Sequence, residues 1–263
     1  MSAPPLSRRA LLVETGIVLA VSLGASAIWS VLSIIRKLTA EQALSSQTTA
    51  MNSSVTPDRP WLDLAYQLTG ITLALAPVAL VLYLLARDHD SEEAPLPLRQ
   101  AARSIGFDLR HPGGDLIRGL VLAALVGIPG LGLYFAARAI GVNTSIAAAN
   151  LGEHWWTIPT LILAALQNGI LEEVVMIGYL FTRWRQAGLA PWLIIGFSAL
   201  IRGGYHLYQG FGGFIGNLAM GVIFGLVYLR LRRVQPLVVA HTVLDIVAFV
   251  GYALLASHLL WLR

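Results

Sequence analysis

Long apolar segments, each of about 20 residues, follow one another along the chain and are separated by short polar connections. A helix needs about 20 apolar residues to cross the hydrocarbon core of a bilayer, so each segment predicts one membrane-spanning helix. We therefore predict an all-α, polytopic transmembrane bundle of about seven spans, or eight if the fourth or seventh segment breaks. The predicted spans are residues 10–35, 61–86, 119–137, 158–182, 191–206, 214–229 and 236–261.

Arginine alternates between the connections, which supports this order of spans. Cytoplasmic connections of membrane proteins carry the excess of Lys and Arg, so the pattern places the N-terminus in the cytoplasm. On this interpretation the arginines near the ends of spans, including Arg183 and Arg233, mark topology and contact lipid headgroups. The arginine-rich connections are the N-terminal segment, 87–118, 183–185 and 230–233.

Composition agrees with a membrane protein and excludes several classes of function. The 263 residues are 56% hydrophobic and only 12% charged, whereas a soluble domain is about 25% charged. The absence of cysteine excludes disulfides, thiolate metal ligands and a cysteine nucleophile. With a net charge of +4 concentrated between spans, we expect contact with membrane lipids and no nucleic-acid binding.

The chain is expected to form one integral membrane domain. Residues 1–118 supply N-terminal spans and a charged cytoplasmic loop, and residues 119–263 form the functional core. The Arg8-Arg9 start and the short loops fit a multi-pass protein of a bacterial plasma membrane.

Glu172 and Glu173 lie in the middle of the fourth predicted span. A charged side chain at the bilayer centre costs about 2.5 to 3.5 kcal/mol on insertion scales, so the pair indicates a functional site. Asn168 precedes Glu172 by one helical turn and shares its face, whereas Glu173 points about 100° away. Only one of the two glutamates is therefore expected to point squarely into a narrow site, with the other bracing it.

Three later spans carry further polar residues. Arg202 and His206 are four residues apart on the fifth span, and His241 and Asp245 repeat that spacing on the seventh. Each pair faces one way, and an aspartate one turn from a histidine can orient it. Asn217 lies among glycines at helix-packing spacing, which favours a hydrogen bond between helices.

Histidines and carboxylates in this number are also ligands for Zn²⁺. The helical HExxH spacing of many zinc proteases is absent, however. We therefore predict neither a metal nor another cofactor.

The polar residues of the late spans occur in an order that resembles the CPBP family of intramembrane proteases, which includes the CAAX-processing Rce1-type enzymes and the bacterial Abi proteins. The family's first motif is a Glu-Glu pair followed by three residues, Arg and often Gly. Its second is Phe-x-x-x-His, and its third is His-x-x-x-Asn or Asp. The matching segments here are EEVVMIG at 172–178, RGGYH at 202–206 and HTVLD at 241–245.

The resemblance implies a glutamate-dependent endopeptidase that acts on a membrane-associated peptide or protein. Glu172 would activate a water with help from His206, and Glu173 would support Glu172. His241 and Asp245 would steady the developing oxyanion, with Asn168, Arg202 and Asn217 as supporting residues. The resemblance covers residues 158–250.

Two positions depart from the family's pattern: Ile177 stands where it has Arg, and Arg202 stands where it has Phe. We expect Arg202 to supply the cation that Ile177 cannot, because an unpaired pair of carboxylates in lipid would be unstable. Two other functions stay open on the residues alone. A proton-coupled transporter would use the same groups as a relay, although no inverted repeat is seen, and an inactive scaffold would keep them for structure.

Overall fold

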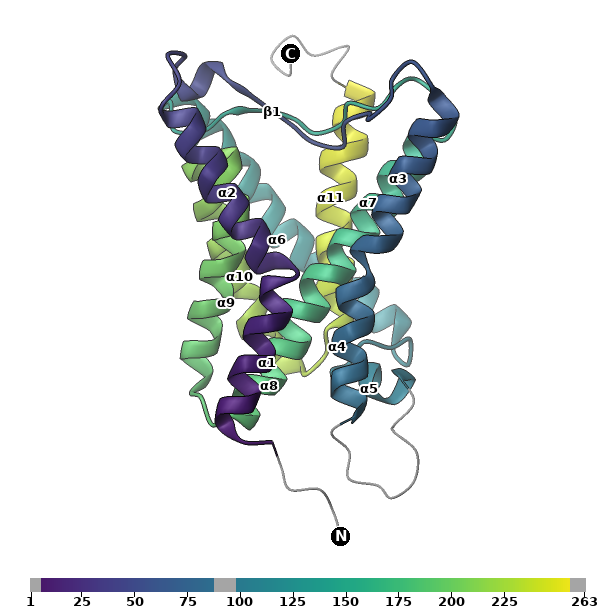
Figure 1. Cartoon of the computed structure of the whole chain (residues 1–263), viewed down its shortest axis with the longest axis vertical. Helices are drawn as coiled ribbons and strands as arrows, with labels where there is room; N and C mark the ends of the chain where they lie inside the picture. Colours follow the sequence, from purple (N-terminus) through teal and green to yellow (C-terminus); the bar gives the residue numbers. More distant parts are fainter. Residues whose placement is uncertain (1–5, 88–97, 256–263) are drawn as a thin grey trace.

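The computed structural model describes residues 6–87 and 98–255 and confirms an all-α bundle (Figure 1). The first half of the chain supplies helices that form the flanks and one end of the bundle. Its elements are α1 (Arg8–Ala20), α2 (Leu23–Leu38), the short 3₁₀ turn η1 (Leu44–Ser46), β1 (Thr48–Ala50), α3 (Pro60–Ala74), α4 (Ala76–Arg87), α5 (Leu98–Ser104) and α6 (Pro112–Ala139).

The second half begins with a short strand and then supplies the helices that carry the polar motifs. The fourth predicted span does not break, although its helix changes type along its length. The elements are β2 (Ser145–Ala147), α7 (Thr157–Glu173), the π-helix η2 (Val174–Tyr179), α8 (Leu180–Gln186), α9 (Pro191–His206), the 3₁₀ turn η3 (Leu207–Gln209), α10 (Phe211–Leu231) and α11 (Gln235–Leu255).

The number of helices able to cross a membrane is smaller than predicted. In the described residues five helical stretches are long and apolar enough, or six if the bent pair α1–α2 forms one span. The difference is α9, the predicted fifth span, which has only 16 residues. The bounds of α9 are those predicted, but its length is below the roughly 20 residues that usually cross a bilayer.

The predicted first span is not one straight helix. α1 and α2 meet at an angle of 52°. At the break, the Ser22 hydroxyl donates a hydrogen bond of 2.6 Å to the Val18 carbonyl. A serine that bonds to the carbonyl four residues earlier competes with the backbone ladder and bends helices.

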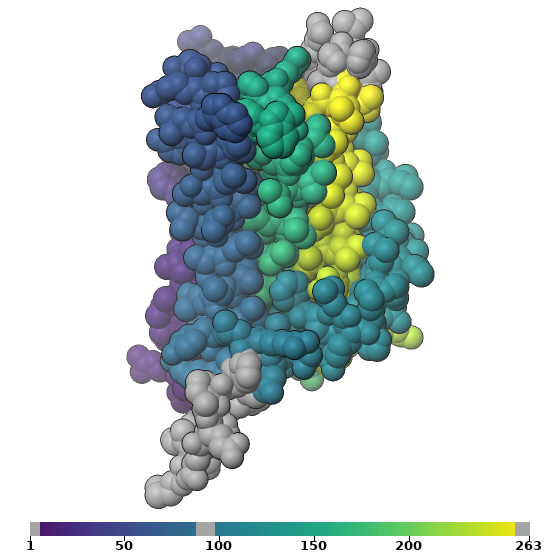
Figure 2. Space-filling model, turned by 90° about the vertical axis from the view of Figure 1, so that its right-hand side faces the viewer, coloured from purple at the N-terminus to yellow at the C-terminus, as the bar shows by residue number. Residues whose placement is uncertain are grey.

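The helices form two groups that diverge toward one end of the bundle (Figure 1). α2, α9 and α10 lie on one side, and α3, α7 and α11 lie on the other. α9 packs along α10, and α7 packs along α11, which also contacts α6. Figure 2 shows α3, α4, α7 and α11 side by side on one face. The late motifs are therefore carried by two packed helix pairs that face each other.

A small parallel sheet crosses the end at which the two groups diverge (Figure 1). β1 pairs with β2 in the register Thr48 to Ser145 and Ala50 to Ala147. The buried Lys37 ammonium donates to the Thr49 hydroxyl and to the Tyr208 carbonyl, at 2.5 Å each. These bonds tie the end of α2 to the turn that follows α9.

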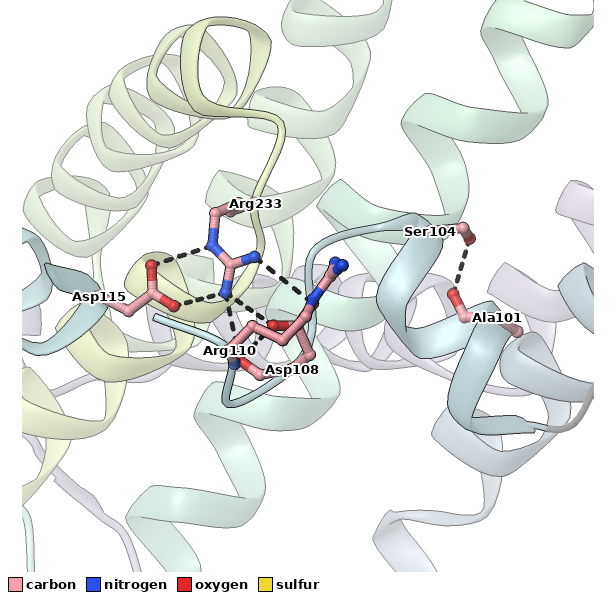
Figure 3. A network of polar contacts seen from close by, with 6 residues as sticks. All are labelled: Ala101, Ser104, Asp108, Arg110, Asp115 and Arg233. Atoms are coloured by element: carbon pink, nitrogen blue, oxygen red, sulfur yellow. Dashed lines mark hydrogen bonds and ion pairs between the residues drawn. The ribbon is translucent and has the colours of Figure 1, made fainter. Parts of the chain in front are cut away.

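At the opposite end, Arg233 joins two connections (Figure 3). Its guanidinium donates to both oxygens of Asp115 at 3.0 and 2.6 Å, and to Asp108 Oδ1 at 3.0 Å. The Gln235 amide at the start of α11 donates to the Gly106 carbonyl at 3.1 Å. The connection after α5 therefore fixes the beginning of α11. The interpretation of Arg233 as a lipid contact was wrong, because its charge is matched within the protein.

The expectation that Arg183 contacts lipid headgroups was likewise wrong. It is fully buried, and its Nε donates to Glu14 Oε1 at 2.7 Å. Tyr179 of η2 donates to the same oxygen at 2.8 Å, and an Arg183 amino group donates to the Leu84 carbonyl at 2.8 Å. One buried cation thus joins α1, α4 and α8, because a buried charge must be paired.

The ion pair between Asp108 and Arg233 predicts that stability depends on pH. Hydrogen bonds from Arg110 and Arg233 hold the pKa of Asp108 well below its usual range. A carboxyl whose pKa is lower in the folded state stabilises the fold above its unfolded pKa, and that contribution is lost as the pH falls below about 4. We expect the thermal stability of the wild type, measured in detergent between about pH 7 and pH 3, to fall more steeply than that of Asp108→Asn. Parallel curves would contradict this assignment.

The buried cation at Arg183 predicts a large loss of stability on truncation. Arg183→Met leaves the Glu14 carboxylate without its main partner, and removing one member of a buried ion pair costs about 3 to 5 kcal/mol. The free energy of unfolding in mixed detergent micelles measures the loss. Arg185→Met is the matched control, because Arg185 is exposed in the same helix. Equal stability of the two variants would show that burial of Arg183 is unimportant.

Candidate active site

Glu172 and Glu173 end α7, and the π-helix η2 follows them directly. A π-helix shifts the backbone hydrogen bonds by one residue, and such segments are frequent at functional sites. The Ser198 hydroxyl of α9 donates to the Met176 carbonyl in η2 at 3.1 Å. A side chain from a neighbouring helix thus satisfies a carbonyl of the irregular segment, as burial in a membrane protein requires.

Arg202 of α9 forms the predicted ion pair with the glutamates. Its two amino groups lie 2.8 Å from Glu173 Oε1 and 3.4 Å from Glu172 Oε2. The Arg202 side chain is fully buried, and its guanidinium lies 5.6 Å from the centre of the Phe224 ring. The cation that Ile177 cannot provide therefore comes from the adjacent helix, and it serves both carboxylates.

The two glutamates differ in access. Glu173 is fully buried, and its Oε2 has no hydrogen-bond partner among the described residues. Glu172 is 8% exposed, and its Oε2 accepts a hydrogen bond of 2.5 Å from the Tyr205 hydroxyl. Its Oε1 takes part in no hydrogen bond within the described chain, yet it is not among the buried unpaired atoms. Glu172 Oε1 is thus neither hydrogen-bonded nor fully buried among the described residues.

His241 of α11 connects the glutamates to Asp245. Its Nδ1 lies 2.7 Å from Glu173 Oε1 and donates the hydrogen bond, because an ionised carboxylate only accepts. Its Nε2 lies 3.8 Å from Glu172 Oε2 and 3.9 Å from Asp245 Oδ1. Asn168 donates to Asp245 Oδ2 at 3.0 Å. The Nε2 atom therefore faces Glu172 and Asp245 at distances that a bridging water can span.

His206 and Asn217 are less closely joined to this cluster. His206 is the last residue of α9, and its Nδ1 lies 3.0 Å from the Arg202 carbonyl. No ion pair links it to a carboxylate in the part of the chain that the structure describes. Its ring lies 4.8 Å from the ring of Tyr205, which contacts Glu172. The shortness of α9 places its end beside the glutamates. Asn217 donates to the Gly213 carbonyl of its own helix rather than to another helix.

Tyr205 is the site residue that the sequence did not single out. It follows Arg202 by three residues, so the two side chains lie on one face of α9, and both reach Glu172. This spacing was the available signal. It was overlooked because a tyrosine near a helix end in a membrane protein is ordinarily an interfacial residue.

Residues 154–247 match the family model described as "Rce1-like: Type II CAAX prenyl endopeptidase Rce1-like". Over this segment the chain is similar to the Rce1-like, type II CAAX prenyl endopeptidases. The segment spans α7 to the middle of α11, and it contains the glutamate pair, Arg202, His206, His241 and Asp245. No curated protein and no solved structure matches the chain.

The Rce1-like segment also contains a group of potential metal ligands. Glu172, Glu173 and His241 each offer one ligand atom, and these atoms lie within 4.8 Å of one another. Such a set suits Zn²⁺. Arg202, however, already supplies positive charge to both carboxylates. A dication held by the same oxygens would have to compete with a buried guanidinium, so we assign no metal to this group.

In this chain the cation stands at position 202 instead of position 177, and this difference from the family pattern can be tested by reversing it. Arg202→Phe leaves two buried carboxylates without their cation and should cost about 3 to 5 kcal/mol in the free energy of unfolding. Adding Ile177→Arg restores the arrangement that the family pattern implies and should recover part of the loss. Unfolding in mixed detergent micelles measures both variants. If Arg202→Phe alone is as stable as the wild type, the compensation does not exist.

Proposed function

We propose that this protein is a glutamate-dependent intramembrane endopeptidase of the Rce1-like type. One observation carries the proposal: Glu172 is fixed by Arg202 and Tyr205 through one oxygen and keeps the other accessible, in a segment of an endopeptidase family. A carboxylate that is fixed within a mainly apolar bundle and has one free oxygen suits a general base.

In the proposed mechanism Glu172 takes a proton from water, and the water oxygen attacks the carbonyl carbon of the scissile peptide bond. The proton then passes to the leaving amine as the carbon–nitrogen bond breaks. His206 helps to position the water. His241 stabilises the oxyanion by donating from Nε2, as oxyanion donors do. Asp245 orients His241, since its carboxylate is itself held by Asn168.

Glu173 supports the site rather than reacting. It is fully buried and lies between Arg202 and the His241 Nδ1 atom. It accepts from His241 Nδ1 and so holds the ring in one orientation. In the proposed mechanism the ring carries a proton on each nitrogen, so Nε2 can donate to the oxyanion. Asn168 and Arg202 act in the same supporting way, and no role beyond packing is proposed for Asn217.

The proposed substrate is a membrane-associated peptide or protein. The arginine-rich end of the bundle, where α1 begins, is proposed to face the cytoplasm. The family description names prenyl endopeptidases, so a prenylated C-terminal tail is one substrate class to test, and an unmodified transmembrane peptide is another.

The test uses the purified protein in lipid nanodiscs with two fluorescence-quenched peptides, one farnesylated at a CAAX terminus and one unmodified transmembrane segment. The wild type should cleave at least one of them. Glu172→Gln and His206→Ala should each lower kcat by about 100-fold or more, since each removes a group from the reacting centre. Both variants should still insert into the membrane.

Glu153→Gln is the control, because Glu153 is an exposed glutamate in the connection before α7. It should cleave at the wild-type rate. Normal turnover by Glu172→Gln would contradict the role of Glu172 as the general base. Failure of the wild type to cleave either peptide would contradict the proposed activity.

A further inference from the structure

Tyr205 is a buried tyrosine whose hydroxyl makes the shortest contact with Glu172. The side chain is 6% exposed, and its Oη donates to Glu172 Oε2 at 2.5 Å. Tyr205 lies within the segment that matches Phe-x-x-x-His, at a position that the motif leaves unspecified. Its role bears on the reaction because it touches the carboxylate proposed to be the base.

We propose that Tyr205 is a positioning residue that holds Glu172 through Oε2 and thereby makes Oε1 the oxygen that takes the proton from water. This inference rests on the proposed function. A carboxylate has two equivalent oxygens and turns about its terminal bond in a broad, two-fold well. A hydrogen bond to one oxygen removes that freedom and directs the other.

The contacts of Glu172 divide in the way this role requires. Oε2 receives the Tyr205 hydroxyl, lies 3.4 Å from an Arg202 amino group and lies 3.8 Å from His241 Nε2. Oε1 has none of these partners. Arg202 is shared with Glu173 at the shorter distance of 2.8 Å, so it cannot by itself determine the orientation of Glu172. Tyr205 is the donor that serves Glu172 alone.

The position of Tyr205 is itself set by close packing of α9 on α10. A Cβ atom on Gly221 would lie 2.7 Å from Ala199 Cα, and one on Gly203 would lie 3.0 Å from the Phe214 carbonyl oxygen. Only glycine permits the two helices to approach so closely. The turn of α9 that carries Tyr205 is therefore held against a rigid neighbour.

In the reaction, an O–H bond of water breaks and the proton passes to Glu172 Oε1, while the water oxygen bonds to the carbonyl carbon. Tyr205 keeps its own proton throughout and remains bonded to Oε2. Without the hydroxyl, the carboxylate turns among several orientations and its free oxygen is less often directed at the water. Substrate binding does not involve this bond, so kcat falls and KM stays the same.

The test compares Tyr205→Phe with Tyr228→Phe in the nanodisc cleavage assay. Tyr228 of α10 is equally buried, at 5% exposure, and lies edge-on to Phe181. Tyr205→Phe should lower kcat by about 10- to 100-fold with KM within about twofold, because a misplaced catalytic group has an effect of this size. Tyr228→Phe should retain the wild-type kcat and KM. An unchanged kcat for Tyr205→Phe, or a rise in KM alone, would overturn the proposal.

Graded replacement separates positioning from a structural role. Fluorotyrosines introduced at position 205 by codon suppression keep the ring and the hydroxyl while strengthening the donor. They should retain most of the kcat that Tyr205→Phe loses. A fluorotyrosine variant as inactive as Tyr205→Phe, or one that unfolds while Tyr205→Phe does not, would contradict the role of the hydroxyl.

An infrared measurement tests the contact without any substrate. With isotope-labelled glutamate, the carboxylate band that disappears in Glu172→Gln is assigned to Glu172, and it should shift in Tyr205→Phe but not in Tyr228→Phe. An unshifted band overturns the Tyr205 proposal even if peptide is cleaved. A shifted band in a protein that cleaves neither peptide supports the contact and places the failure in the proposed function.

Discussion

One guanidinium shared by two buried carboxylates is the interaction on which the site depends. Glu172 and Glu173 cannot lie inside an apolar bundle unless a cation accompanies them, and Arg202 reaches both from the neighbouring helix. This requirement fixes the distance between the pairs α7–α11 and α9–α10. The two glutamates also differ: Glu173 is fully buried and hydrogen-bonded to His241, whereas Glu172 is slightly exposed.

The same rule organises the arginine-rich end of the bundle. Arg183 joins α1, α4 and α8 through Glu14 and the Leu84 carbonyl. Arg233 joins the connection before α11 to Asp108 in the connection after α5 and to Asp115 in the first turn of α6. These cations lie near the ends of the helices that carry the site. Arg183 follows the glutamates in the same continuous helix. Arg233 lies just before α11, the helix that carries His241. The polar groups that hold the helices in register thus lie at a different level from those proposed to react.

Much of this arrangement could be predicted from the sequence. Hydropathy located every helix that carries a motif, and the four-residue spacing of Arg202 and His206 placed them on one helix. The unmatched charge of the glutamates also led to Arg202. Contacts between distant residues were not predictable in this way. Glu14 and Arg183 are far apart in the sequence, and each alone resembles an ordinary end-of-span charge. Tyr205 was missed because only the orientation of α9 shows that its hydroxyl reaches Glu172.

A double-mutant cycle between Arg202 and Glu173 tests the central interaction most directly. The free energy of unfolding in mixed detergent micelles is measured for the wild type, Arg202→Met, Glu173→Gln and the double variant. Each single variant should lose about 3 to 5 kcal/mol through an uncompensated buried charge, and the double variant should lose far less than the sum. Losses that simply add would show that the two residues are independent and would contradict the account.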